Sequence, residues 1–434
     1  MQVMKLGGSC LRDKSGFIKM VEVLRQNNNE PLIMVVSAFS SATRKLKKAA
    51  ITAENGDHME AVKIIDDLGS EHYHFCDILL DKKENRVKLK SLYDEGIARI
   101  KQYLKGISIT EDLTPRTLDI VLSFGELFAL KTIHSFLTEQ GFDAYGIDST
   151  KLIISDDNYG KAKPNLERST ELIEKNLKPI LNGKRIILTQ GFVAMSETGE
   201  ITTMGMESSN LTAVILAALL NCRRLTFWTN VEGIRNIDPL IAGETECIPS
   251  MSYDLAYQAA KNGLKLIYPL MIDYARKYNI ELIFRSVFNP GGEHTVISPE
   301  SENIKKLTII NSGNTIFSAN ISSNEDEVRI KEELKKVALE GFDDALMIKY
   351  SDTLIMIFPS NHEHLFQIKD QNTNIKKNIS VITQYSIFEN EIPDIRKILT
   401  GNDIMSCIEK KDGYFITRLF IADDKSKEAV REIL

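Results

Sequence analysis

The chain has 434 residues, 43% of them hydrophobic, and a formal net charge of −6 at pH 7. A chain of this length and composition can bury a sizeable core and is expected to form two or three domains. Its charges are not gathered into a long run of one sign, so the sequence gives no indication of binding to nucleic acid or to an anionic membrane. The five scattered cysteines include no CxxC pair, which argues against a disulfide framework and a zinc site.

No apolar segment of signal length opens the chain, and the longest apolar run, residues 213–220, is far too short to cross a bilayer. The seven histidines show no ligand spacing, so we expect no metal site built by the protein alone. From these features we expect a soluble protein in the cytoplasm, without a membrane partner.

Up to about residue 298, short β-rich runs alternate with amphipathic stretches, which is the pattern of an α/β protein whose parallel sheet carries helices on both faces. The predicted strands include residues 31–36, 185–188, 224–228 and 280–284. Their nearly continuous apolar character is typical of strands buried on both faces. Residues 41–118 are helical and charged in composition, so a helical lobe is expected beside the sheet.

The Pro/Gly turn at residues 289–292 marks the predicted end of a first domain, residues 1–298. The expected elements after it are strands at 308–310 and 315–321, a helix at 325–339, strands at 345–350, 353–358 and 379–385, a helix at 392–399, strands at 404–409 and 414–421, and a helix at 426–434. Because a similar order recurs, residues 305–434 are predicted to hold two βαββ-type units, about 305–370 and 371–434. Each unit is too small to be an enzyme on its own.

The first candidate motif is Lys5-Leu6-Gly7-Gly8-Ser9-Cys10, directly after the first predicted strand. Glycines at such a point let backbone amides approach an anion, and a lysine supplies a charge for phosphate oxygens. Taken alone, a strand that ends in two glycines also fits an ordinary tight turn. The motif becomes informative through the others that follow it.

Those other motifs occur in a fixed order along the chain. They are Ser37-Ala38 with Thr43, the run from Arg116 to Gly125-Glu126, Gln190-Gly191-Phe192, the run from Thr203 to Ala213, Trp228-Thr229-Asn230, Asp238-Pro239, Met251-Ser252-Tyr253-Asp254, the run from Gly263 to Pro269, and Phe288-Asn289-Pro290. In this order and at these spacings, the whole chain resembles the aspartate kinases. It is most similar to the kinase portion of the bifunctional aspartate kinase–homoserine dehydrogenases.

The resemblance implies a three-layer amino-acid kinase fold with a mainly parallel central sheet, followed by two ferredoxin-like α+β ACT domains. It implies phosphoryl transfer from MgATP to the side-chain carboxylate of L-aspartate, giving 4-phospho-aspartate in the biosynthesis of lysine, threonine and methionine. The Mg²⁺ would be bound mainly through the nucleotide. A homodimer or higher homo-oligomer, with a possible amino-acid effector at the ACT domains, is also implied. Because the acceptor carboxylate is already ionised at neutral pH, this chemistry needs cations and placement rather than a general base.

The resemblance also assigns roles to single residues. The catalytic positions are Lys5, which would neutralise charge on the transferring phosphoryl group, and Asn210. The positions that hold the amino acid are Ser37, Thr43, Glu126, Met206 and Ser209. The positions that hold ATP are Lys5, Gly7, Gly8, Ser9, Thr229, Asn230, Asp238 and Lys265.

Four positions depart from the family pattern. Met206 replaces an arginine that grips a carboxylate of aspartate, and Asn210 replaces an aspartate that helps order the active-site lysine. Asn230 replaces an aspartate of the nucleotide loop, and Leu240 replaces the arginine of an Asp-Pro-Arg sequence. A charged hydrogen bond is worth about 1.5–3 kcal/mol, so four such losses together could abolish useful activity. The segment Ser208-Ser209-Asn210 still provides a well-capped helix start.

Two further segments bear on function. Arg44 and Lys45 follow Thr43 directly and could supply a replacement cation. In the tail, the loop at residues 322–327 is acidic and lacks the glycine that helps relatives bind a feedback amino acid, so feedback by threonine or lysine is not expected. Pairing of ACT sheet edges between two chains is still expected.

Three functions are therefore open from the sequence. The first is an aspartate kinase. The second is a catalytically impaired paralogue that acts as a regulatory subunit. The third is a kinase for a different carboxylate, which lacks the group that the missing arginine would hold.

Overall fold

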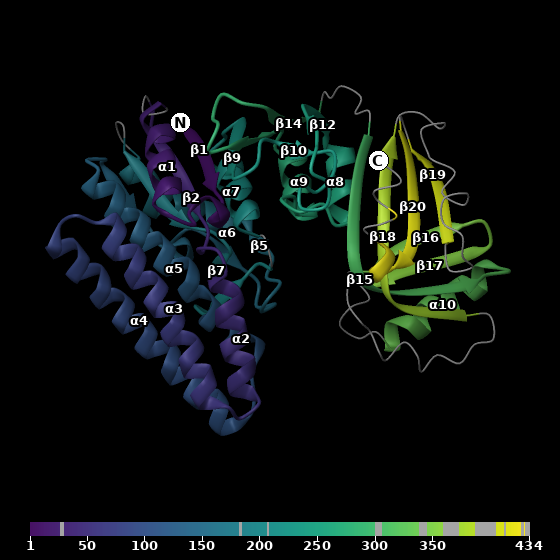
Figure 1. The fold of residues 1–434 in the computed structure, drawn as a ribbon, viewed down its shortest axis with the longest axis horizontal. Helices are drawn as coiled ribbons and strands as arrows, with labels where there is room; N and C mark the ends of the chain where they lie inside the picture. Colours follow the sequence, from purple (N-terminus) through teal and green to yellow (C-terminus); the bar gives the residue numbers. More distant parts are fainter. Residues whose placement is uncertain are drawn as a thin grey trace. The chain divides into compact units, whose positions relative to one another are not determined.

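The computed structural model describes residues 1–26, 30–181, 185–205, 208–299, 306–337, 345–358, 373–386, 405–411, 414–426 and 429. The chain divides into two compact units (Figure 1). The first consists of Met1–Ile234 with Leu266–Glu300, and the second of Arg235–Lys265 with Ser301–Leu434. The division at residue 300 lies close to the turn at 289–292. However, residues 235–265 group with the second unit, although they fall inside the predicted range 1–298.

The first unit is built on a mainly parallel sheet. Its strands are β1 (Gln2–Leu6), β2 (Leu32–Val36), β3 (Ala144–Gly146), β6 (Ile186–Gln190), β9 (Arg224–Thr229), β13 (Glu281–Ser286) and β14 (His294–Ser298). Their order within this unit is β14-β13-β9-β1-β2-β6-β3, and only the β13–β14 pair in that series is antiparallel. All five residues of β2, Leu-Ile-Met-Val-Val, are buried, as expected for a central strand covered on both faces.

Helices form a layer on each face of this sheet. One face packs against α1 (Lys14–Gln26) and α5 (Pro115–Glu139) in a core that also takes in the bundle of α2 (Ala42–Glu54), α3 (His58–Leu79) and α4 (Lys83–Thr110). In Figure 1 these long helices lie side by side. The other face packs against α7 (Ser208–Leu219), and α7 contacts α9 (Pro269–Lys277). The predicted three-layer α/β fold and the helical lobe are confirmed.

Helix α5 begins with a well-formed cap and is buried along most of its length. Thr114 caps its N-terminus by accepting a hydrogen bond from the Thr117 amide at 3.1 Å, and Pro115 occupies the first turn. It is the one helix in the described ranges that is long and apolar enough to cross a membrane. Its apolar side chains, including Phe128 and Ile133, are instead packed in the core.

A small second sheet in the first unit has the order β5-β4-β7-β8. Its strands are β4 (Ile154–Ser155), β5 (Pro164–Asn165), β7 (Val193–Ser196) and β8 (Ile201–Thr203), and α6 (Leu166–Leu172) follows β5. Strand β8 leads directly into the segment that ends at α7.

The second unit contains a six-stranded antiparallel sheet. Its strands are β15 (Lys306–Asn320), β16 (Leu346–Tyr350), β17 (Thr353–Phe358), β18 (Thr373–Ser386), β19 (Met405–Lys411) and β20 (Tyr414–Ala422). Read outward from the central β15–β18 pair, both halves have the same pattern, β15-β17-β16 and β18-β20-β19. This symmetry fits two ACT-like repeats that share one sheet. Helix α10 (Asn324–Val337) packs on the first half through Ile330 and Leu334.

The structure corrects one detail of this region. The predicted strands at 308–310 and 315–321 are a single strand, β15, because a bulge absorbs the Gly313 turn within it. Gly313 has a φ of +79°, which a residue with a side chain rarely adopts. The helix predicted at 392–399, and most of the one at 426–434, lie outside the described residues.

The segment 235–265 of the second unit holds short elements. They are β10 (Ile234–Arg235), β11 (Cys247–Ile248), β12 (Ser250–Ser252) and α8 (Tyr253–Lys261). Ser252 caps α8 by accepting a hydrogen bond from the Leu255 amide at 3.2 Å.

Candidate functional site

The carboxyl ends of β1 and β2 open onto one cavity. The two strands are parallel, with Lys5 in register with Val35, so the chain leaves both at the same edge of the sheet. The cavity has a volume of about 230 Å³ and is lined by Lys5, Ser37, Ala38, Thr43, Glu126, Ser209, Asn210 and Leu266. Six residues predicted from the sequence, Lys5, Ser37, Thr43, Glu126, Ser209 and Asn210, are therefore brought together.

The predicted phosphate loop follows β1 as a 3-10 turn, Gly8–Cys10. The Gly7 amide donates to the Trp228 carbonyl at 3.0 Å, and the Ser9 hydroxyl donates to Asn230 Oδ1 at 3.0 Å. A Cβ atom at Gly8 would lie only 2.1 Å from the Ala38 carbonyl oxygen. Glycine at this position is thus required by the close approach of two backbones, one of which, at Ala38, lines the cavity.

Glu126 is the acidic group of the cavity. It comes from α5 and is only 4% exposed. The Ala38 amide donates to it, but Oε2 has no hydrogen-bond partner. Burial raises the pKa of Glu126 to about 8, against the opposing effects of the Ala38 amide and the Lys5 ammonium. At neutral pH the carboxyl group therefore holds a proton until a cation approaches it.

The start of α7 also lines the cavity, through Ser209 and Asn210. Asn210 donates from Nδ2 to the Leu266 carbonyl at 2.8 Å, while its Oδ1 is buried without a partner. The hydroxyl of Ser208 is likewise buried and unpartnered. Gly191 allows this arrangement, because a Cβ there would lie 2.5 Å from the Ser209 Cα.

The contact of Asn210 explains part of its departure from the family pattern. Leu266 has a φ of +78°, a conformation that is strained for a residue with a side chain. The amide of Asn210 can donate to its carbonyl, whereas an ionised aspartate could only repel it. Asn210 therefore fastens this segment of backbone and leaves one acceptor oxygen without a protein partner.

Two other predicted residues shape the loop after β9. The Thr229 hydroxyl donates to the Val231 carbonyl at 2.7 Å and accepts from the Val231 amide at 3.2 Å. Asn230 holds Ser9, as described above. Their contacts favour a role in ordering the loop beside Gly7 and Gly8.

Asp238 and Lys265 belong to the second unit, whereas the site residues described above belong to the first. Their side chains form an ion pair of 3.3 Å, and the Lys265 side chain is 74% exposed. Asp238 also accepts a hydrogen bond from the Leu240 amide at 2.9 Å. The predicted nucleotide residues are thus split between the two units.

Three predicted positions, Met206, Arg44 and Lys45, are not among the described residues that line the cavity. Met206 and Glu207 lie outside the described residues, so the substrate role of Met206 stays a prediction. Neither Arg44 nor Lys45 lines the cavity; Arg44 is exposed, and Lys45 forms an ion pair with Glu71 at 2.7 Å.

One residue that the sequence did not single out is Asp119. Only 1% exposed, it accepts hydrogen bonds from the Gly160 amide at 2.9 Å, the Thr203 amide at 2.8 Å and the Thr203 hydroxyl at 2.6 Å. Burial raises its pKa, and these three bonds oppose that rise. Asp119 lies seven residues before Glu126 on α5, and Thr203 ends β8. It therefore ties the helix that carries Glu126 to the segment that leads to α7.

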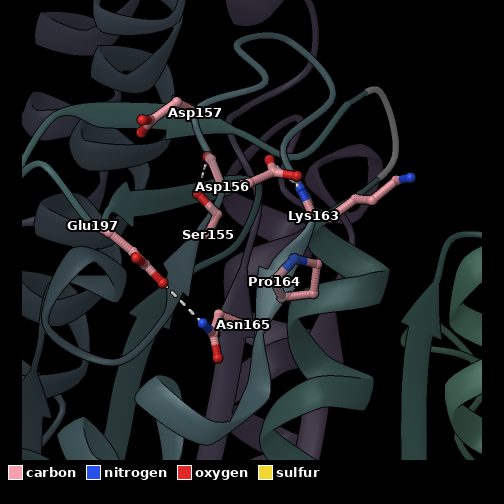
Figure 2. Close-up of a pocket in the computed structure, with 7 residues that line it drawn as sticks. All are labelled: Ser155, Asp156, Asp157, Lys163, Pro164, Asn165 and Glu197. Carbon is pink, nitrogen blue, oxygen red and sulfur yellow. Dashed lines mark hydrogen bonds between the residues drawn. The ribbon is translucent and has the colours of Figure 1, made fainter.

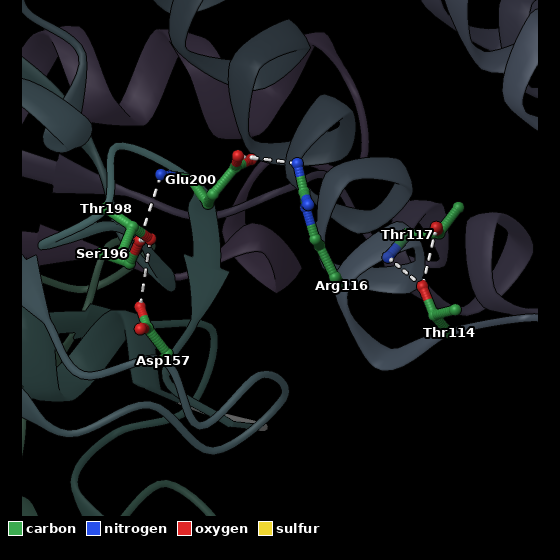
Figure 3. A network of polar contacts seen from close by, with 7 residues as sticks. All are labelled: Thr114, Arg116, Thr117, Asp157, Ser196, Thr198 and Glu200. Atoms are coloured by element: carbon green, nitrogen blue, oxygen red, sulfur yellow. Dashed lines mark hydrogen bonds and ion pairs between the residues drawn. The ribbon is translucent and has the colours of Figure 1, made fainter.

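A nearby ion pair joins the same two elements. Figure 3 shows Arg116, from the first turn of α5, reaching Glu200 just before β8, with a separation of 2.7 Å. Glu200 in turn donates its backbone amide to the Ser196 hydroxyl. The run from Arg116 to Glu126 was a recognisable motif, but its partners at residues 160–203 could not be found from sequence spacing.

A larger, acidic cavity lies elsewhere in the first unit. It measures about 480 Å³ and is lined by Ser155, Asp156, Asp157, Lys163, Pro164, Asn165 and Glu197 (Figure 2). Its polar groups serve the fold: Asp156 accepts from the Lys163 amide, and Asn165 donates to Glu197 at 2.9 Å. None of its lining side chains has a buried polar atom without a partner. The smaller cavity at Glu126 is the better candidate for a binding site. Its lining includes buried polar atoms, Glu126 Oε2 and Asn210 Oδ1, that have no hydrogen-bond partner in the protein and could bond to a ligand.

No group of three His, Cys, Asp or Glu residues in the described ranges could hold a metal ion. A metal used at the Glu126 cavity would therefore need ligands from the bound substrate. Nucleotide phosphates are the usual partners of Mg²⁺ in such sites.

Comparison with known proteins gives a consistent result. The family model described as "Amino acid kinase family" matches residues 1–286. The chain is 27% identical to bifunctional aspartokinase/homoserine dehydrogenase 2 of Arabidopsis thaliana, over 70% of this chain and 33% of that protein. It is 26% identical to lysine-sensitive aspartokinase 3 of Escherichia coli, over 69% of this chain and 65% of that protein. The chain thus spans about a third of the length of the bifunctional relatives it matches.

Among solved structures, E. coli aspartokinase III in complex with aspartate and ADP superposes with a TM-score of 0.82. The match covers 99% of this chain and 98% of the other, at 18% sequence identity. At that identity the likeness establishes the fold alone.

Proposed function

This chain belongs to the amino acid kinase family, and from that premise we propose that it is an aspartate kinase. The reaction would transfer the γ-phosphoryl group of MgATP to the side-chain carboxylate of L-aspartate. The relatives reported above are named as aspartokinases, which supports the choice of acceptor. The solved relative in complex with aspartate and ADP supports the same pair of ligand classes.

The single observation that carries the proposal is the shared cavity of Lys5 and Glu126. An ammonium group and a buried carboxyl group, delivered by β1 and α5, face one space of about 230 Å³. That volume is smaller than a drug-sized pocket and suits a small amino acid. The unpartnered Oε2 of Glu126 is suited to accept a hydrogen bond from the substrate ammonium.

In the proposed reaction, a side-chain carboxylate oxygen of aspartate attacks the γ-phosphorus. The bond from that phosphorus to the bridging oxygen breaks, and its electron pair leaves with ADP. No proton moves, so no residue has to act as a base. Lys5 would neutralise charge on the transferring group, while the glycines at positions 7 and 8 would let the backbone of the Gly8–Cys10 turn approach phosphate oxygens. Mg²⁺ would enter bound to the nucleotide.

Two ligand effects follow for Glu126. Before substrate binds, the raised pKa of Glu126 keeps the carboxyl group protonated at neutral pH. A substrate ammonium beside Oε2 favours the ionised form, so aspartate binding should release a proton at a pH below about 8.

Lys265, whose side chain is largely exposed, would contact the nucleotide phosphates.

The test is to trap the acyl phosphate with hydroxylamine in the presence of MgATP and aspartate. We expect hydroxamate from the wild-type chain and a fall in kcat of at least about 100-fold in Lys5→Ala, since preorganised charge stabilisation is typically worth that much. Lys19→Ala is the matched control, because Lys19 pairs with Glu22 on the exposed face of α1. It should keep wild-type activity.

Two results would contradict the proposal. Absence of product with aspartate, but product with another carboxylate such as succinate, would assign a different acceptor. Absence of product with every acceptor, together with absence of ATP binding, would identify a non-catalytic paralogue.

A further inference from the structure

Asp119 lies on the same side of α5 as Glu126. The two residues are seven positions apart on the helix, and seven residues make almost two turns, so their side chains leave it in nearly the same direction. Two turns correspond to about 10 Å along the helix axis. Helix α5 therefore carries two buried carboxyl groups in line, and only Glu126 lines the cavity.

Asp119 is hydrogen-bonded on both of its oxygens, unlike Glu126. Oδ2 accepts from the Gly160 and Thr203 amides at 2.9 and 2.8 Å, and Oδ1 accepts from the Thr203 hydroxyl at 2.6 Å. Hydrogen bonds to an ionised group are shorter and stronger than neutral ones. The Ala162 amide also donates to the Thr203 carbonyl at 3.0 Å. Asp119 thus anchors the end of β8 and the loop around residue 160, which are bonded to each other as well.

The ion pair of Arg116 with Glu200 joins the same two elements, but more weakly (Figure 3). The two side chains are 52% and 34% exposed, and exposed ion pairs contribute little because water screens them. A buried carboxylate, in contrast, is strongly unfavourable unless its oxygens keep their hydrogen bonds. Asp119 is therefore the stronger link between α5 and β8.

A short series of hydrogen bonds connects the end of β8 to α7. Met204, which follows Thr203, donates its amide to the Phe192 carbonyl at 3.0 Å. The Phe192 amide donates to the Thr212 hydroxyl of α7 at 3.2 Å, and that hydroxyl donates to the Ser208 carbonyl at 3.1 Å. The first turn of α7 is thus bonded, through Phe192, to the strand end that Asp119 anchors.

These contacts matter for the cavity because α5 and α7 both line it. Glu126 comes from α5, and Ser209 and Asn210 come from the start of α7. The start of α7 has little room to adjust by itself, because a Cβ at Gly191 would already lie 2.5 Å from the Ser209 Cα. A shift at the end of β8 should therefore change the spacing between Glu126 and the residues of α7.

We infer that Asp119 is a positioning residue for the acceptor: through Thr203 it sets the spacing between Glu126 and the α7 residues that line the same cavity. The inference rests on the proposed function, which gives this cavity an amino acid to bind. Asp119 does not line the cavity itself, so it acts through the residues that do. None of the bonds described here involves the Gly8–Cys10 turn, so binding of the nucleotide should be affected less than binding of aspartate.

The first test uses Thr203→Val in the full chain, because valine keeps the shape of threonine and removes only the hydroxyl that donates to Asp119. We expect the KM for aspartate in the hydroxylamine assay to rise about 5- to 20-fold, because small misplacements of binding groups are expensive. The KM for ATP should stay within about twofold of the wild-type value. Thr203→Ser, which keeps the hydroxyl, should keep the KM for aspartate within about twofold as well.

Asp119→Asn tests the carboxylate directly. An amide has one acceptor oxygen and one NH₂ group, so at least one donor of Gly160 or Thr203 would face another donor. The KM for aspartate should rise at least as much as in Thr203→Val. In the double variant the rise should be smaller than the product of the two single effects, because both substitutions remove the same contact.

Thr132→Val is the matched control. Thr132 also lies on α5 and is 1% exposed, as Thr203 is, but its hydroxyl is hydrogen-bonded to the Tyr93 hydroxyl of α4. The substitution should lower Tm about as much as Thr203→Val and leave the KM for aspartate unchanged. Loss of positioning is thereby separated from a general loss of stability.

Three results would overturn the inference. A wild-type KM for aspartate in Thr203→Val and Asp119→Asn, or an equal rise in Thr132→Val, would mean that Asp119 serves only the fold. A rise in the KM for ATP by the same factor as that for aspartate would mean that the acceptor is not what Asp119 positions. In both cases wild-type protein still forms hydroxamate. If it forms none with aspartate, the proposed function fails and the positioning role fails with it.

Discussion

The cavity around Glu126 and the cluster of Asn262 with Tyr385 and Arg418 both bury polar side chains, but they differ in how completely those side chains are hydrogen-bonded. Within the part of the chain that the structure describes, Glu126 Oε2 and Asn210 Oδ1 have no partner. Both amide atoms of Asn262 are partnered twice. An unpaired buried polar group costs about 1–3 kcal/mol. The unpaired atoms of the cavity thus lower the stability of the fold but remain available to bind a ligand. The paired polar atoms of the cluster stabilise the fold instead.

Substitutions in the Glu126 cavity and in the Asn262 cluster should therefore have different effects. In the cavity, a change should cost function more than stability. In the cluster, removal of one member should expose the others to an unpaired state and cost stability.

The largest effect is expected for Gly8→Ala. The added methyl group would lie 2.1 Å from the Ala38 carbonyl oxygen, so the two backbone segments must move apart. The Ala38 amide also donates a hydrogen bond to Glu126, so its displacement would disturb both the phosphate loop and the Glu126 cavity. We expect kcat/KM to fall at least about 100-fold in the hydroxylamine assay.

Gly106→Ala provides the control for that variant. Gly106 lies within α4, and a Cβ there would meet nothing within 4 Å. Alanine in an open helical position stabilises by about 0.5–1 kcal/mol, so Tm should rise slightly and activity should not change. Wild-type activity in Gly8→Ala would mean that the glycine pair is an ordinary tight turn.

The next effect is expected for Glu126→Gln, which replaces the ionisable carboxyl group of the cavity with a neutral amide. Loss of a charged hydrogen bond to the substrate ammonium, worth about 1.5–3 kcal/mol, should raise the KM for aspartate roughly 10- to 100-fold at pH 8. The wild-type KM should itself fall as the pH rises from 6 to 8, because Glu126 must lose its proton to bind the ammonium. The variant should lack that pH dependence in steady-state kinetics.

Glu126 should also make the stability of the folded chain depend on pH, in the opposite direction to its effect on substrate binding. A rise in pH favours binding of aspartate but lowers the free energy of unfolding. The pKa of Glu126 is raised in the folded chain from 4.5 to about 8, so the folded state binds more protons than the unfolded state between these values. The contribution to stability is therefore complete below pH 4.5 and is lost as the pH rises to about 8, by at most about 1.4 kcal/mol per pH unit. Urea unfolding of ligand-free protein should show this slope, and Glu126→Gln should reduce it. An unchanged slope would place the unpaired carboxyl group in solvent.

The sequence allowed the cavity to be predicted better than the cluster, for a physical reason. The apolar run of β2 and the lysine–glycine motif after β1 report local structure, and parallel strands bring their carboxyl ends to one edge. Glu126 was found because it sits in a motif that resembles a family. Each of these signals is carried by a few consecutive residues.

Other features depend on contacts that no spacing records. The three bonds of Asp119 reach residues 160 and 203, and those of Asn262 reach residues 383 to 418. The single strand β15 was divided in the prediction because Gly313 looks like a turn, whereas pairing with β18 on both sides of it keeps the strand continuous. Tertiary pairing overrode the local signal in that case.

The smallest effect is expected for Lys45→Ala and Arg44→Ala, which ask whether α2 replaces the cation lost at Met206. The Lys45 ammonium pairs with Glu71 at 2.7 Å, both side chains are partly exposed, and neither cation lines the cavity. Exposed pairs contribute at most about 1 kcal/mol, so the free energy of unfolding should change by less than that in Lys45→Ala. The KM for aspartate should change by less than about twofold in either variant. A tenfold rise in either one would mean that α2 turns a cation toward bound aspartate, and substrate binding would then depend on a residue outside the cavity lining described above.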